Sequence, residues 1–273
     1  MNNEILDQQG EAHSGARNLS VSNSFKRGYE LFKKQWLVLV GALILFSILT
    51  VLVQWLAGYI DVVGSIIYTL FSACLYAGFF ILYHQIAKGK EPSFSHFFGG
   101  FKFIKDITLY QLVYLVFILV ASIPVFLGVA VAFAPAASDL VNWFGEGMNP
   151  QELTGVLQGV SFSPVFVIFF AVSFVLYLVV GMSYLLTTPL IVLNKKSFWE
   201  AMELSRKAVW SRFFTFFALL IVLVLFNILG LIVLIVGVVF TGAISVGVFY
   251  AAYESLFSHL KTEESPEVAD DDV

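Results

Sequence analysis

Long apolar stretches alternate with short charged segments along this chain, and the lengths of the apolar stretches predict membrane-spanning helices. One crossing of a bilayer about 30 Å thick needs roughly 20 apolar helical residues. Residues 36–83 contain a single charged residue, Asp61, and residues 213–253 contain none. Each of these stretches is therefore long enough for two crossings joined by a tight turn, and the second turn is expected between Gly230 and Gly237.

Two further stretches, residues 107–133 and 165–193, each have the length of one crossing. The pattern therefore predicts an all-α, polytopic membrane protein. Its six transmembrane helices are expected at about 36–59, 62–84, 107–133, 165–193, 213–233 and 237–257.

The positions of lysine and arginine predict how these spans are oriented. All fifteen lie outside the spans, in four segments: before residue 36, at 88–105, at 195–212 and at residue 261. Because Lys and Arg in short loops are retained on the cytoplasmic side during insertion, both termini are expected in the cytoplasm. We expect a disordered leader at 1–22, one membrane domain at 23–260 with an exterior loop at 134–163, and an acidic, disordered tail at 261–273.

The composition excludes a soluble globular protein. Of 273 residues, 59% are apolar and only 12% are charged, which is too little polar surface to cover a globule in water. Cys74 is the only cysteine, so neither an intramolecular disulfide nor a thiolate metal site is expected. We expect no cofactor and no bound metal. Nucleic acid is not an expected partner, because the cations lie next to the spans and among aromatic residues.

A short amphipathic segment precedes each pair of predicted spans, and each segment begins with a Ser-Phe dipeptide. Apolar side chains follow Ser24, Ser93 and Ser197 at spacings of three, four and seven residues, which places them on one helix face opposite the charged residues. Ser197 and Glu200 also have the spacing of a capping box. We expect three interfacial amphipathic helices whose cations contact anionic headgroups.

The arrangement of one amphipathic helix followed by two spans occurs repeatedly along the chain. We interpret it as three parallel copies of one unit, with an insertion at 134–163 in the second copy. The alternative is a chance recurrence of residues that are common in membranes. Small residues at 243, 247 and 251 recur every fourth position and are expected to permit close packing inside the molecule.

Two neighbouring motifs resemble a known group of proteins. Residues 187–190 read Thr-Thr-Pro-Leu, and residues 197–206 read Ser-Phe-Trp-Glu-Ala-Met-Glu-Leu-Ser-Arg. This arrangement resembles the bacterial YciC-like inner-membrane proteins and the membrane domain attached to some glycerophosphodiester phosphodiesterases. The resemblance implies a multi-pass protein of the bacterial cytoplasmic membrane. It implies no catalytic activity, because no phosphodiesterase domain accompanies the motifs in this sequence.

Polar residues in or beside the predicted spans are the candidates for a functional site. Glu254 and His84 lie at the cytoplasmic ends of the last and the second span. Because they occupy matching places in the repeat, one hypothesis is that they share a polar site open to the cytoplasm. Alternatively, each side chain simply reaches headgroup water. Gln54, Gln111 and Asn227 would either line a transport pathway or form interhelical hydrogen bonds.

Pro124 and Pro189 lie within two of the predicted spans and are candidate breaks beside a pathway. Neighbouring helices can nevertheless satisfy the backbone groups that a proline frees. No nucleophile elbow, phosphate-binding loop or zinc-binding motif occurs in the sequence, so no catalytic residue is assigned.

These observations favour a non-catalytic integral protein of the bacterial inner membrane that acts as a scaffold, an assembly factor or an envelope-maintenance component. The alternative is a passive or lipid-handling transporter, and a membrane-embedded enzyme acting on lipid is a third hypothesis. A cavity lined by Gln54, Gln111 and Asn227 would favour transport, whereas a tightly packed bundle would favour the scaffold. The expected partners are lipids with anionic headgroups and other membrane proteins.

Overall fold

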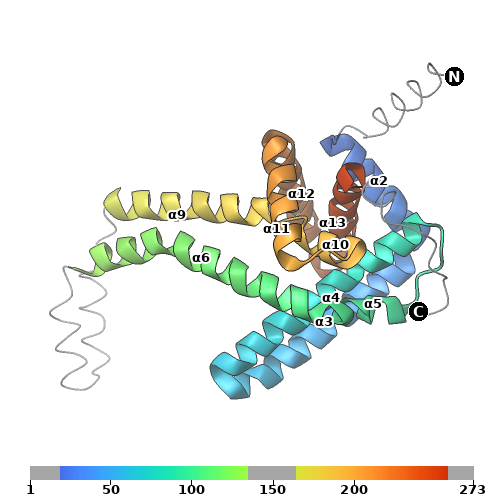
Figure 1. Ribbon diagram of the computed structural model, residues 1–273, viewed down its shortest axis with the longest axis horizontal. Coiled ribbons are helices and arrows are strands. Elements are labelled where there is room, and N and C mark those ends of the chain that lie inside the picture. Colours follow the sequence, from blue (N-terminus) through green and yellow to red (C-terminus); the bar gives the residue numbers. More distant parts are fainter. Residues whose placement is uncertain (1–18, 135–163, 258–273) are drawn as a thin grey trace. The chain divides into compact units, whose positions relative to one another are not determined.

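The computed structural model describes residues 19–134 and 164–257, and every regular element within them is helical (Figure 1). A helix satisfies its backbone hydrogen bonds within one segment, as long apolar stretches require. The elements are α2 (Val21–Lys34), α3 (Trp36–Ala57), η1 (Gly58–Ile60), α4 (Asp61–Ala87), α5 (Phe94–Phe97), η2 (Phe98–Phe103), α6 (Ile104–Phe133), α9 (Pro164–Ser183), α10 (Thr187–Asn194), α11 (Phe198–Ser211), α12 (Phe213–Ile232) and α13 (Leu234–Phe257).

Six helical runs in the described residues are long and apolar enough to cross a membrane, which confirms the predicted number of candidate spans. The third run begins at Phe94 rather than at residue 107, because α5 and η2 continue without a gap into α6. A turn at residues 184–186 divides the fourth run into α9 and α10. The runs are Trp36–Ile60, Val62–Ala87, Phe94–Phe133, Pro164–Asn194, Phe213–Ile232 and Gly237–Phe257.

Both predicted hairpin turns are present. The short 3-10 helix η1 separates α3 from α4 directly before Asp61. The second turn lies at Val233, between α12 and α13, and therefore within the predicted interval.

Serine caps two of the three amphipathic segments at the predicted position. The Ser93 hydroxyl accepts a hydrogen bond from the Ser95 amide, and the Ser197 hydroxyl accepts one from the Glu200 amide at 3.4 Å. The predicted start of the first segment is wrong, because Ser20 caps α2 and Ser24 lies buried one turn inside it. The last residues of the predicted leader, from position 21, are therefore helical.

Several predictions fall on residues that the structure does not describe. They are the exterior loop from residue 135 onward, the first 18 residues of the leader, and the acidic tail at 261–273.

The chain forms two compact units. The larger one comprises residues 1–111 and 183–273, and the smaller one is Leu112–Met182. Each is considered by itself.

Three contacts in the larger unit follow one pattern. The second amphipathic segment, formed by α5 and η2, packs on α4, and the third, α11, packs on α10. The first, α2, packs on α13, beside which it lies in Figure 1. Each segment thus contacts the second span of the copy before it in the predicted repeat, and α2 contacts the second span of the last copy.

In the smaller unit, α6 continues through Pro124, so this proline does not end the helix. Proline disturbs the backbone hydrogen bonding of the surrounding turn. Here the amide of Val125 donates to the hydroxyl of Ser173 on α9 at 2.9 Å. One turn earlier, the hydroxyls of Ser122 and Tyr177 are 2.7 Å apart. Polar side chains therefore join α6 to α9 at the proline.

Candidate functional site

The candidate site is the place in the larger unit where α2 packs against α13. The buried residues of α2 are Ser24, Gly28, Leu31 and Phe32, and of these Gly28 and Phe32 lie against α13. A Cβ atom on Gly28 would lie 2.6 Å from the backbone nitrogen of Val248, which no real contact tolerates. Glycine at this position therefore permits the two helix backbones to touch.

Small residues on α13 supply the other side of this contact. Ala243, Gly247 and Ala251 are all buried, as expected from their spacing of four. The Tyr83 hydroxyl on α4 donates a hydrogen bond to the Ala243 carbonyl at 2.6 Å, and its ring lies against Gly247. The stripe of small residues thus accommodates both α2 and an aromatic ring of α4, which confirms the expectation of close packing inside the molecule.

An ion pair joins α2 to α13 beside the glycine contact. The Arg27 Nε atom donates to the Glu254 carboxylate at 3.0 Å, and a second Arg27 nitrogen lies 3.4 Å from the other carboxylate oxygen. The two side chains are 30% and 28% exposed, so the pair is only partly screened by solvent. The hydrogen bond that Arg27 donates to Glu254 raises the pKa of Arg27 above its ordinary value, and the guanidinium is therefore always charged.

His84 on α4 enters the same cluster through a tyrosine. Its Nδ1 atom lies 3.0 Å from the Tyr250 hydroxyl, and the Tyr250 ring also stacks on Tyr83 with centroids 6.1 Å apart. Tyr250 lies one helical turn before Glu254 on α13. The two residues expected to share a polar site are thus brought into one cluster, each with its own hydrogen-bond partner.

A last hydrogen bond ties this cluster to α10. The Tyr253 hydroxyl donates to the side-chain oxygen of Asn194, the last residue of α10. We use the name polar cluster for the set of side chains that connects α2, α4, α10 and α13: Arg27, Tyr83, His84, Asn194, Tyr250, Tyr253 and Glu254.

The structure places the three uncharged candidates separately from this cluster. Asn227 on α12 donates to the Ser245 hydroxyl on α13 at 2.8 Å and to the Leu223 carbonyl of its own helix. Gln54 is exposed on α3, and Gln111 is half-buried on α6. For Asn227 the geometry is that of the interhelical hydrogen bond, one of the two interpretations the sequence left open.

Pro189 lies in the first turn of α10, two residues after the helix begins at Thr187. An amide in the first turn has no intrahelical partner, so a proline there removes no helical hydrogen bond. Thr187 itself is fully buried, and its hydroxyl has no hydrogen-bond partner among the described residues.

Two cations of α11 pair with one carboxylate of the same helix. Arg206 donates to the Glu203 carboxylate at 2.7 and 2.9 Å, and the Lys207 ammonium lies 3.2 Å from it. These hydrogen bonds lower the pKa of Glu203 to about 2. At the start of α11, Asp106 accepts a hydrogen bond from the Phe198 amide, which places a negative charge at the positive end of the helix.

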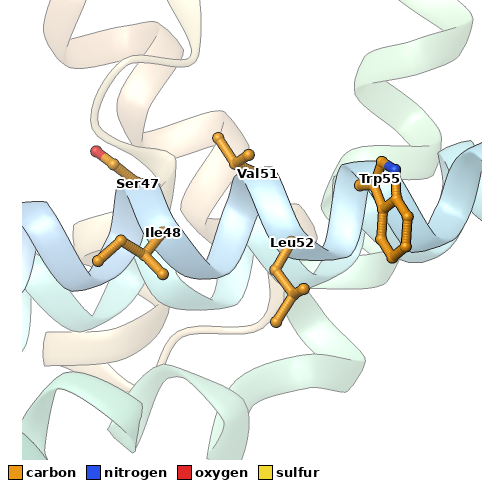
Figure 2. Close-up of a pocket in the computed structure, with 5 residues that line it drawn as sticks. All are labelled: Ser47, Ile48, Val51, Leu52 and Trp55. Atoms are coloured by element: carbon orange, nitrogen blue, oxygen red, sulfur yellow. The ribbon is translucent and has the colours of Figure 1, made fainter.

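A shallow, open groove runs along one face of α3. Figure 2 shows its lining, which comes from this one helix and comprises Ser47, Ile48, Val51, Leu52 and Trp55. The Ser47 hydroxyl bonds to the Leu43 carbonyl of the same helix, so the groove offers an almost purely apolar surface.

Sequence reasoning missed Arg27, Tyr250 and Asn194 as members of the polar cluster. The sequence contains one indication for Arg27. Its neighbour Gly28 shares a face with the apolar residues of α2, which indicates a packed contact next to Arg27. No pattern along the chain could pair Arg27 with a carboxylate 227 residues away. Within residues 19–134 and 164–257, no group of three His, Cys, Asp or Glu side chains is placed to hold a metal ion.

Comparisons with known proteins returned no match: no family model, no curated protein and no solved structure is similar to this chain.

Proposed function

We propose that this chain is a non-catalytic, multi-pass protein of the bacterial inner membrane that acts as a scaffold, an assembly factor or an envelope-maintenance component. The six long apolar helical runs within the described residues carry many exposed large apolar side chains, among them Val51, Val62 and Phe214. Such continuous apolar surface suits contact with lipid or with other membrane proteins. The proposal includes cytoplasmic termini and membership of the YciC-like group.

The polar cluster is the observation that carries this proposal. A side chain that performs acid–base chemistry or binds a substrate must be within reach of that substrate. Glu254 is instead held by Arg27, and His84 contacts the Tyr250 hydroxyl in the packed contact between α4 and α13. Asn227 likewise bonds to Ser245. We interpret these polar groups as the connections that fix the helices to one another.

The contacts of the amphipathic segments support a pseudo-repeat of three copies. Each segment packs on the second span of the preceding copy, and α2 completes the series by packing on α13. A chance recurrence of common membrane residues predicts no such regularity of contacts. We propose that this closed series of contacts gives the scaffold a rigid core, from which the apolar helices present their outer faces to partners.

Topology labelling tests the membrane arrangement. Single cysteines are introduced at Lys261 and at Trp143 in a Cys74→Ser background, and intact cells are treated with a membrane-impermeant maleimide. We expect labelling at position 143 in intact cells, and at position 261 only after the cells are opened. The reverse pattern, or labelling of both positions from outside, would overturn the proposed orientation.

Lipid transport is a second candidate function. The observation that favours it is the open apolar groove along α3, a surface that suits an acyl chain (Figure 2). A scrambling assay separates the two candidates. The purified protein is reconstituted into vesicles with a fluorescent lipid, and dithionite quenching of the inner leaflet is followed over time. A scaffold leaves quenching at the level of empty vesicles, whereas faster quenching that is lost in a Val51→Trp variant would establish transport.

A further inference from the structure

The outward face of α2 carries three lysines and one carboxylate, that of Glu30, and therefore has a net positive charge. Lys26, Tyr29 and Lys33 are exposed and lie on the helix face opposite the buried contact with α13, and Lys34 is exposed beside them. Within the described part of the chain, the three lysines form no ion pair. The Lys33 ammonium lies over the ring of Tyr29, 5.5 Å from its centroid.

Two features of the larger unit distinguish this face from the other helical segment that is rich in cations. Around α11, Arg206 and Lys207 share the carboxylate of Glu203, and Lys196 lies 3.2 Å from Glu200, so each of these three cations contacts a carboxylate. On α2, Arg27 is the cation that has an acidic partner among the described residues, and that partner, Glu254, belongs to α13. Because Arg27 is paired with Glu254, the outward face has three lysines and the single carboxylate of Glu30.

The packing of α2 also fixes where these lysines point. Because the Gly28 backbone touches α13 and Arg27 is held by Glu254, the helix is held against the bundle in one rotational setting. Leu31 and Phe32 of α2 are buried and Phe25 is half-buried. Phe25 packs on Phe226 and Phe32 on Phe240, with ring centroids 5.1 and 5.9 Å apart. What α2 offers to a partner is therefore its lysines rather than its apolar face.

We propose that this face, formed by Lys26, Lys33 and Lys34 and here called the α2 basic face, binds the phosphate groups of anionic phospholipids. The inference rests on the proposed function, which places α2 beside the inner leaflet of a membrane. Ammonium groups at a membrane surface are attracted to anionic headgroups, and each contributes about 1 kcal/mol. The exposed side chains of Tyr29 and of Trp36, the first residue of α3, have the amphipathic character that suits the headgroup level.

Lipid selectivity measured on charge-matched variants tests this proposal. The full chain is purified in dodecylmaltoside and mixed with micelles that contain phosphatidylglycerol or phosphatidylcholine at equal mole fraction. Native mass spectrometry then gives the ratio of the two lipids retained. The variant Lys26→Gln with Lys33→Gln removes two charges from α2, and the control Arg206→Gln with Lys207→Gln removes two charges from α11.

We expect the wild-type protein to retain phosphatidylglycerol preferentially, and the α2 double variant to lose this preference by about fivefold for each lysine, the change that ~1 kcal/mol per cation predicts. The α11 double variant is expected to keep most of the preference. Substituting arginine at both α2 positions is expected to restore it. Because these residues are exposed, all variants are expected to fold, and their melting temperatures report whether they do.

Three results would overturn the inference: equal retention of both lipids by the wild-type protein, equal losses in the α2 and α11 variants, or unchanged selectivity in the α2 variant. None of them affects the labelling of positions 143 and 261, on which the proposed function depends. Conversely, exterior labelling of position 261 would refute the proposed orientation, whatever the lipid selectivity.

Discussion

Replacement of Gly28 by alanine is the most direct test of how α2 is held on α13. The added methyl group would lie 2.6, 2.7 and 2.9 Å from three backbone atoms of Gly247 and Val248. Backbone atoms cannot rotate away as a side chain can, so the two helices must move apart. Overpacking of this kind typically costs about 1–3 kcal/mol.

Part of this cost is offset, because alanine favours a helix over glycine by about 1 kcal/mol. Gly58→Ala provides the matched control. Gly58 has helical backbone angles, and no atom lies within 4 Å of the position that an added methyl group would take, so its substitution carries no steric cost. The Gly28 variant is therefore expected to be less stable than the Gly58 variant by about 1–3 kcal/mol.

The free energy of unfolding is obtained by titrating each variant with sodium dodecyl sulfate in dodecylmaltoside micelles. Limited digestion with trypsin supplies a local measurement, because Lys26, Lys33 and Lys34 become better substrates if α2 separates from α13. The reasoning would be refuted if the Gly28 variant were as stable as the Gly58 variant and equally resistant to trypsin.

Three further predictions concern individual side chains. In a double-mutant cycle of Arg27→Gln and Glu254→Gln, we expect a coupling of about 1 kcal/mol, because the ion pair is partly buried; additivity in detergent unfolding would contradict this. Thr187→Val is expected to stabilise the protein by about 1 kcal/mol, because it removes a buried hydroxyl without a partner, and a lowered melting temperature would contradict the packing described for α10. The hydrogen bonds to Glu203 lower its pKa from 4.5 to about 2. Their stabilisation of the folded protein is therefore present above pH 4.5 and is lost as the pH falls toward 2. The difference in melting temperature between the wild type and Glu203→Gln should shrink over that range.

The sequence predicts the helical runs well because hydrophobic length is a local property. Apart from the third run, which begins at Phe94 rather than at residue 107, the predicted spans agree closely with the helical runs of the structure, including the turns near Asp61 and Val233. The prediction is wrong where a boundary depends on capping detail. Ser20 rather than Ser24 caps α2, since either serine fits the periodicity and only the backbone at the helix start distinguishes them.

The polar cluster could be predicted only in part, because its members come from four helices that are distant in the sequence. His84 and Glu254, which occupy matching positions in the predicted repeat, lie in one region of the molecule. Their hydrogen-bond partners, Tyr250 and Arg27, depend on how the helices rotate about their axes, which hydrophobic spacing does not determine when a helix is apolar on all sides.

The contact between α2 and α13 has a consequence for biogenesis. Chains leave the ribosome from the N-terminus, so α2 is synthesised long before α13, whose Glu254 stands 227 residues after Arg27. During that interval the face of α2 that contains Gly28 lacks its native neighbour, α13. The helix therefore stays undocked, at the membrane or bound to a chaperone, until the final hairpin is inserted. Nascent chains that are stalled ahead of α13 should therefore expose an undocked α2, which makes completion of the last hairpin the step that commits this protein to its final form.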